Sequence, residues 1–117
     1  MSRRVVAVVN NLFFVAKLQS AARQASVDLT FASTEDELLE KARAGAELVV
    51  FDLGDQDLQA LAAIKRLRSE PDTADVPMLG FLRHTQPEVA ERARAAGCEN
   101  VMPRSQFSAQ LVDLLRG

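Results

Sequence analysis

Cysteine and histidine are almost absent from this chain, which has one of each. Cys98 alone cannot close an internal disulfide, and Cys98 with His84 cannot form a structural zinc site, because such a site takes four ligands. We therefore expect a reducing, cytoplasmic compartment. Two arginines and an apolar run at residues 3–9 are similar to a leader peptide, but Asn10 and Asn11 interrupt the hydrophobic stretch, so we expect no leader.

An excess of positive charge is also missing, since 14 Lys and Arg face 16 Asp and Glu and the formal net charge is -2. Nucleic-acid binding needs cations that neutralise phosphates, so we expect no direct nucleic-acid partner. No run reaches the roughly 18 apolar residues of a membrane span, so we expect no membrane partner. At 117 residues and 48% apolar composition, the chain is predicted to form one soluble domain over residues 1–117.

Short apolar runs alternate with longer stretches of helical spacing, which is typical of strands buried on both faces between crossover helices. We predict strands at residues 5–9, 27–31, 48–51, 76–82 and 100–102, with the first and third most central. We predict helices at residues 12–25, 34–45, 58–70, 85–97 and from about 105 onward. This (βα)5 order predicts an α/β, doubly wound, five-stranded parallel sheet of flavodoxin-like type, in three α/β/α layers.

Local signals mark the beginnings of two predicted helices. Asn11 is a good N-cap for the first helix, and Thr34 with Glu37 three residues later forms a capping box for the second. The first helix begins with two aromatic residues, Phe13 and Phe14. We expect this pair to seat the helix on the sheet, with a small exposed hydrophobic patch as the alternative.

Binding in such a sheet belongs at the carboxyl ends of the strands. Asp52 directly follows the apolar residues of the third strand, which is an unusual place for a charge. This position predicts a nucleophile or metal ligand, because an aspartate can attack phosphorus and form an aspartyl phosphate. The alternative is a strand-ending aspartate that caps the following turn.

Phosphoryl transfer to a carboxylate needs a cation, normally Mg²⁺, which carboxylates and water hold. Asn10 and Asn11 follow the first strand and offer only neutral amide oxygens, so their cluster with Asp52 would carry one negative charge at most. We expect such a cluster to bind Mg²⁺ weakly, and we predict no resident cofactor. Asp55 and Asp57 lie close in sequence, but a turn and a helix N-cap explain them.

Four stretches together resemble the receiver domain of response regulators, the CheY-like family: residues 5–11, 48–52, 75–79 and 95–101. The resemblance covers essentially the whole chain. It implies that Asp52 occupies the phosphoacceptor position. It also implies a signalling module of a two-component or phosphorelay pathway rather than an enzyme, with a signalling protein or an output domain as its partner.

The departures from that family are as informative as the matches. By resemblance, the acidic pair that holds Mg²⁺ falls on Asn10 and Asn11, and the fourth-strand hydroxyl residue falls on Leu82. The fifth-strand lysine falls on Arg104, and the aromatic residue of that strand falls on Val101. These replacements predict a pseudo-receiver that works by protein contacts without phosphorylation. The alternative is a phosphoryl-accepting receiver with an atypical metal site.

The resemblance also implies a partner face, formed by the fourth helix, fifth strand and fifth helix. In this chain the face includes Arg92, Arg94, Val101 and Gln110, although the charges would equally suit a solvated helix surface. Because Val101 replaces the aromatic switch residue, we expect weak coupling to the phosphoacceptor position. We therefore expect constitutive partner binding or a homodimer.

Other side chains leave alternatives open. Arg104 is expected either to pair with Asp52 or to stay solvated without a fixed partner. We expect Cys98 to be a small buried packing residue and His84 to be solvent-exposed. A flavodoxin-like binder of a small anionic ligand in the same crevice is a third function to consider.

Overall fold

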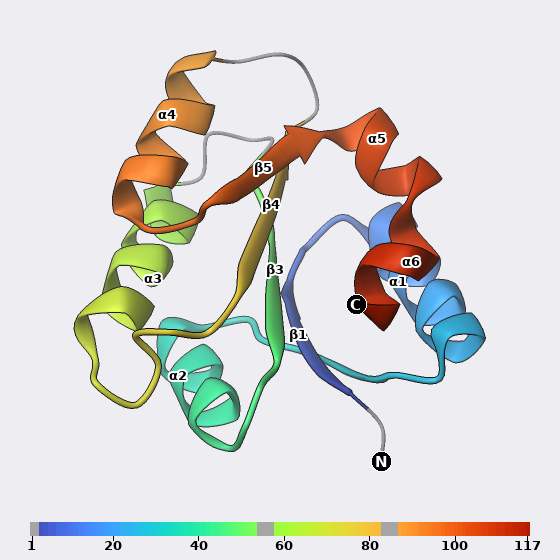
Figure 1. The fold of residues 1–117 in the computed structure, drawn as a ribbon, viewed down its shortest axis with the longest axis horizontal. Helices are drawn as coiled ribbons and strands as arrows, with labels where there is room; N and C mark the ends of the chain where they lie inside the picture. Colours follow the sequence, from blue (N-terminus) through green and yellow to red (C-terminus); the bar gives the residue numbers. More distant parts are fainter. Residues whose placement is uncertain (1–2, 54–57, 83–86) are drawn as a thin grey trace.

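The computed structural model describes residues 3–53, 58–82 and 87–117 (Figure 1). Its sheet has five parallel strands in the order β2-β1-β3-β4-β5. The strands are β1 (Arg4–Val8), β2 (Asp28–Phe31), β3 (Leu48–Asp52), β4 (Met78–Leu82) and β5 (Asn100–Pro103). The first and third strands lie inside the sheet, as predicted, and so does β4.

Helices cover both faces of the sheet (Figure 1). They are α1 (Leu12–Ala25), α2 (Glu35–Arg43), α3 (Leu58–Ser69), α4 (Pro87–Ala96), α5 (Arg104–Ala109) and α6 (Leu111–Arg116). One core lies between the sheet and α2, α3 and α4, and a second lies between the sheet and α1, α5 and α6. The predicted doubly wound, three-layer α/β/α fold is confirmed. No helix of the described ranges is long and apolar enough to cross a membrane.

Alternation along the strands divides the core in two, because successive side chains of a strand point to opposite faces. In β3, Val49 and Phe51 pack toward α2, α3 and α4, while Leu48 and Val50 pack toward α1, α5 and α6. All four are buried. The apolar runs that predicted the interior strands are continuous because both faces of those strands are covered.

The predicted helix caps form. The Asn11 side-chain oxygen accepts hydrogen bonds from the backbone N–H groups of Phe13 at 2.9 Å and Phe14 at 3.4 Å. The Thr34 hydroxyl accepts from the Glu37 N–H at 3.1 Å, and the Glu37 carboxylate accepts from the Ser33 N–H at 2.6 Å. Both helices therefore begin where their capping residues predict.

The fourth strand begins later than predicted, at Met78 rather than at residue 76. The Val76 N–H donates to the Thr73 carbonyl at 3.2 Å within a turn, and its carbonyl accepts from Arg68 at 2.7 Å. Pro77 has no N–H to give to a neighbouring strand. The Pro77 carbonyl does accept from the Val49 N–H of β3 at 2.9 Å, but Val76 is held in the turn and Pro77 cannot donate, so the regular ladder starts at Met78.

The last predicted helix is two helices, α5 and α6, instead of one. Gln110 separates them, with φ -109° and ψ 12°, which lies outside the helical region. Phe107 before the break and Leu111 and Leu115 after it are all buried against the sheet. The apolar spacing that predicted a helix here is correct for both pieces, but it carries no signal for the break.

Arg68, near the end of α3, binds two loops at once. Its guanidinium donates to the carbonyls of Ala74 and Val76, each at 2.7 Å, and of Gly97 at 2.9 Å. It also pairs with the Glu99 carboxylate at 2.8 Å. The Arg68 cluster, meaning Arg68 with these four partners, joins α3 to the chain before β4 and to the chain before β5.

Cys98 is fully buried, which confirms its predicted packing role. Burial, together with the smaller effect of the Glu99 charge, raises the pKa of its thiol from 9.0 to about 11. In the unfolded chain the thiol has its ordinary pKa of 9.0. The protonated thiol therefore makes its full contribution to the free energy of unfolding below pH 9, and this contribution is lost as the pH rises toward 11.

Between pH 9 and pH 11 the free energy of unfolding is expected to fall in the natural chain and in Cys98→Ala. We expect the fall to be about 2 kcal/mol larger in the natural chain. Urea titrations followed by far-UV circular dichroism would measure this difference. Equal pH dependence in the two proteins would contradict the account of a buried, protonated thiol.

Candidate functional site

The predicted site residues gather at the carboxyl edge of the sheet, because parallel strands end on the same side. Asp52 is the last residue of β3 and is partly buried, with Phe81 of β4 as its neighbour in the ladder. Asn10 and Asn11 follow β1, and Arg104 is the first residue of α5 after β5. The topology thus brings the four positions to one edge.

The two asparagines at this edge have different surroundings. The side-chain oxygen of Asn11 is the N-cap acceptor of α1, where it binds two backbone N–H groups. Asn10 is exposed and lines a cavity beside α2 and α3. An oxygen that caps a helix is a poor candidate for a metal ligand, because binding a cation would compete with the cap.

The donor set at this edge fits Mg²⁺ poorly. Asp52 is the one carboxylate among the four predicted site residues, and the oxygen of Asn11 is engaged in the cap. Within residues 3–53, 58–82 and 87–117, no three His, Cys, Asp or Glu side chains form a group that could hold a metal. Asp55 and Asp57 lie outside the described residues. Weak Mg²⁺ binding stays a prediction.

Arg104 has an aromatic partner. Its guanidinium carbon lies 4.3 Å from the centroid of the Phe14 ring, and the side chain is half-buried. This distance is within the range of a cation–π interaction. Arg104 is therefore not a solvated residue without a fixed partner, which was one of the two expectations for it. Its ion pair with Asp52 stays a prediction.

Three phenylalanines from distant parts of the chain pack together, and one of them, Phe14, lies beneath Arg104. Phe14 of α1 and Phe81 of β4 have ring centroids 5.0 Å apart, and Phe81 and Phe107 of α5 have centroids 4.3 Å apart. We call Phe14, Phe81 and Phe107 the aromatic column. Sequence reasoning missed this column, because only the fold brings residues of such separation together. It connects Arg104 to the ladder neighbour of Asp52.

The two aromatic residues that begin α1 have opposite environments. Phe14 is buried, with 2% of its surface exposed, and belongs to the aromatic column. Phe13 is 63% exposed and Leu12 is 82% exposed, so the expectation that Phe13 helps to seat the helix is wrong. The Lys17 ammonium lies 5.3 Å from the Phe13 ring centroid. The alternative of an exposed hydrophobic patch is correct for Leu12 and Phe13.

The structure also shows the surroundings of Leu82 and of the predicted partner face. Leu82 ends β4 and is buried in the core shared with α2, α3 and α4. Arg92, Arg94 and Gln110 are exposed, and Val101 is half-buried on the edge strand β5. The proposed partner face is therefore accessible at three of its four named positions. His84 lies outside the described residues.

No family model and no curated protein matches this sequence. Solved structures are similar to it over nearly the full length of both chains. A Vibrio cholerae chemotaxis protein, CheY4, has a TM-score of 0.82 at 18% identity, covering 99% of this chain and 98% of that one. A Thermotoga maritima response regulator has a TM-score of 0.79 at 15% identity, with coverages of 99% and 96%.

A response regulator protein from Burkholderia multivorans has a TM-score of 0.75 at 25% identity, covering 98% of this chain and 93% of that one. The same strand order and the alternation of strands and helices account for these similarities. At such low identities the agreement concerns the backbone rather than the site residues. The chain thus has the fold of CheY-like response-regulator receiver domains.

Proposed function

We propose that this chain is a receiver-like signalling domain of a two-component or phosphorelay-type pathway. It is a cytoplasmic protein-contact module rather than an enzyme, and it works without phosphorylation. The observation that carries the proposal is the cap made by Asn11, whose side-chain oxygen binds α1 at the position where the resembled family holds its metal. The cation at position 104 is likewise engaged with Phe14.

The electrostatic argument concerns the charge that develops during phosphoryl transfer. That charge is spread over three oxygens and is normally neutralised by Mg²⁺. With amides at positions 10 and 11, the end of β1 offers no carboxylate to hold the ion. Leu82 has no hydroxyl to donate to a phosphoryl oxygen. Asp52 therefore keeps its place at the strand end without the groups that would make it reactive.

The test is intact-mass measurement after incubation with Mg²⁺ and acetyl phosphate. We expect no phosphoryl adduct on the natural chain, as for the control Asp52→Ala. A double variant, Asn10→Asp with Asn11→Asp, restores two carboxylates and keeps a capping residue at position 11. We expect that variant to bind Mg²⁺ more tightly than the natural chain.

The alternative function is a phosphoryl-accepting receiver that uses Asp52 with an atypical metal site. It is supported by the aspartate at the end of an interior strand and by the basic residue at position 104. Under this alternative, the natural chain gains a phosphoryl group on Asp52 and Asp52→Ala does not. That result would contradict phosphorylation independence and leave the signalling role intact.

We propose that the contact surface includes α4 and the edge strand β5, where Arg92 and Arg94 are exposed. We expect a homodimer whose dissociation constant rises about tenfold or more in Arg94→Glu, because a reversed charge at an interface costs more than 1 kcal/mol. Sedimentation velocity over a range of concentrations measures this. Gln24→Glu, on α1, is the control. A chain that stays monomeric and binds no protein of its own pathway would refute the contact mechanism.

A further inference from the structure

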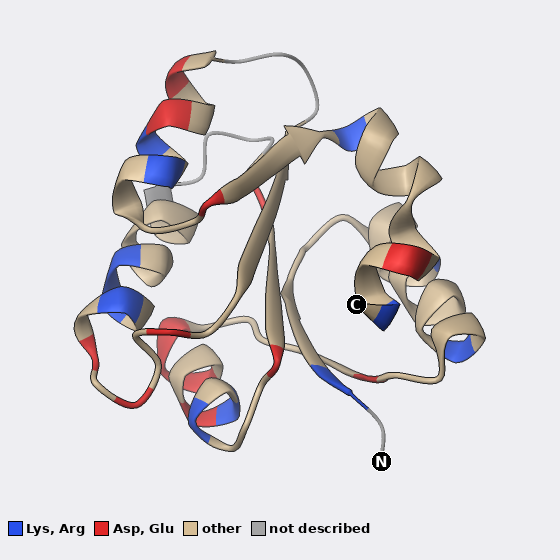
Figure 2. Cartoon of the chain, in the orientation of Figure 1, with Lys and Arg blue, Asp and Glu red and all other residues tan. Residues whose placement is uncertain are grey.

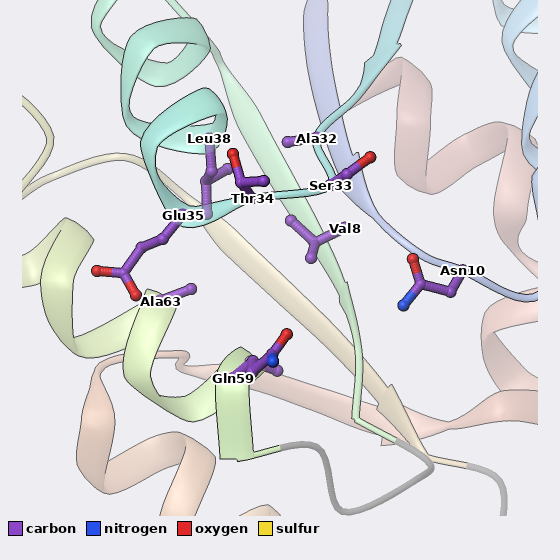
Figure 3. Close-up of a pocket in the computed structure, with 10 residues that line it drawn as sticks. Val8, Asn10, Ala32, Ser33, Thr34, Glu35, Leu38, Gln59 and Ala63 are labelled. Carbon is purple, nitrogen blue, oxygen red and sulfur yellow. The ribbon is translucent and has the colours of Figure 1, made fainter.

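A cavity of about 470 Å³ lies beside the carboxyl end of β1, next to α2 and α3 (Figure 3). This volume is within the usual range for small-molecule sites. Apolar side chains of the sheet and the two helices form half of its lining: Val8, Ala32, Leu38, Ala60 and Ala63. The alanines of α3 leave the room that larger residues would fill.

Among the described residues, the polar part of the lining is almost entirely uncharged. Within that part of the chain no lysine or arginine lines the cavity, and the one acidic lining residue, Glu35, is paired with Arg66 at 2.9 Å. A bound anion would therefore lose its hydration without gaining a cation. The carboxylate of a zwitterionic amino acid would likewise lose its hydration without gaining a cation. The lining favours an uncharged ligand.

The beginning of α2 offers no place for a phosphate either. Thr34 and Glu37 already accept hydrogen bonds from N–H groups at the beginning of the helix. The first turn also holds three acidic residues, Glu35, Asp36 and Glu37, and Figure 2 colours the acidic positions of α2 red. These groups repel an anion at the end of the helix where one would otherwise bind.

Two side-chain amides line the opening. Figure 3 shows Asn10 on the β1 side and Gln59 on the α3 side, with Val8 between them in this view. An amide offers a donor and an acceptor together, which suits the paired N–H and nitrogen acceptor on the edge of an adenine ring. The apolar walls suit the face of such a ring.

We propose that this cavity binds an uncharged adenine nucleoside. The base lies against the partly buried Val8, and the exposed amide of Asn10 reads its edge. This binding site is separate from Asp52 and does not depend on the signalling role proposed above. The anionic-ligand crevice considered from the sequence lies at the same edge of the sheet and shares Asn10, but the lining of this cavity favours a neutral ligand.

Isothermal titration calorimetry of the whole chain with adenosine tests the proposal, with AMP as the matched probe that adds only a phosphate. We expect saturable binding of adenosine, with AMP binding no more tightly. Asn10→Ala is expected to weaken adenosine binding about tenfold by removing hydrogen bonds to the base. Ala63→Leu is expected to abolish binding by filling the cavity.

Gln24→Ala removes an exposed amide on α1, far from the cavity lining, and is the matched control with unchanged affinity. Circular dichroism establishes that each variant is folded, and the exposed position of Asn10 keeps that variant informative if Ala63→Leu does not fold. Absence of saturable adenosine binding would overturn the proposal. So would tighter binding of AMP, or adenosine binding that neither Asn10→Ala nor Ala63→Leu weakens.

Discussion

Replacing Phe107 with alanine is expected to lower the free energy of unfolding by about 3–5 kcal/mol. Phe107 has no exposed surface, and its ring stacks on Phe81 with an angle of 11° between the ring planes. Truncation leaves a cavity in the core between the sheet, α1 and α5, and it removes the member of the aromatic column that contacts both Phe81 and Phe14. Urea unfolding followed by far-UV circular dichroism measures the effect, since the chain has no Trp or Tyr for fluorescence.

Phe13→Ala is the matched control, because it makes the same chemical change at an exposed phenylalanine. We expect it to change stability by less than about 0.5 kcal/mol. The comparison isolates burial from the chemistry of the substitution. Equal effects of the two variants would mean that the aromatic column does not support the fold as described.

The second large effect is expected at Arg68. Arg68→Ala removes hydrogen bonds to three backbone carbonyls and an ion pair with Glu99. Those carbonyls lose a charged donor, so we expect a loss of about 3 kcal/mol in the free energy of unfolding. Arg68→Lys should rescue little of it, because one ammonium cannot reproduce the fork of donors that a guanidinium provides.

Arg66→Ala is the control, two residues earlier on the same helix. Arg66 also pairs with carboxylates, those of Glu35 and Glu70, but its partners are side chains at the surface. Exposed ion pairs contribute little, so we expect almost no change in stability. If Arg66→Ala and Arg68→Ala destabilise the chain equally, the carbonyl contacts of Arg68 have no special role.

These two variants also separate the fold from the proposed function. Phe81 stacks on Phe107 and is the ladder neighbour of Asp52, so the aromatic column lies directly beside the candidate site. The Arg68 cluster, in contrast, connects α3 with the chain before β4 and β5. We expect Phe107→Ala to disturb the surroundings of Arg104 through the column, whereas Arg68→Ala should act on stability alone.

Local signals in the sequence predicted most of the fold. The spacing of apolar residues and the cap at Asn11 predicted α1 with its observed bounds, because an N-cap and an amphipathic stripe depend only on nearby residues. The same holds for Thr34 and Glu37 at α2. The strand bounds differ by one or two residues, as at Met78, where the preceding Val76 donates its N–H to the Thr73 carbonyl and accepts at its own carbonyl from Arg68.

The candidate site was predicted by position, whereas its contacts were not. The order of strands and helices placed Asp52 and Arg104 at the same sheet edge, because parallel strands end on one side. The contact of Arg104 with Phe14 depends on how α1 packs beside α5, which no local pattern specifies. The environments of Phe13 and Phe14 likewise differ because only one ring faces the sheet.

The sequence by itself determined the alternation of strands and helices, the interior strands and the absence of carboxylates at positions 10 and 11. These properties follow from composition, period and local capping, which act over a few residues. Only the tertiary structure decided which side-chain oxygen caps a helix, which aromatic ring contacts the Arg104 guanidinium, and where the cavity beside β1, α2 and α3 lies. Those outcomes depend on contacts between residues far apart in the chain, and their geometry exists only after the layers have packed.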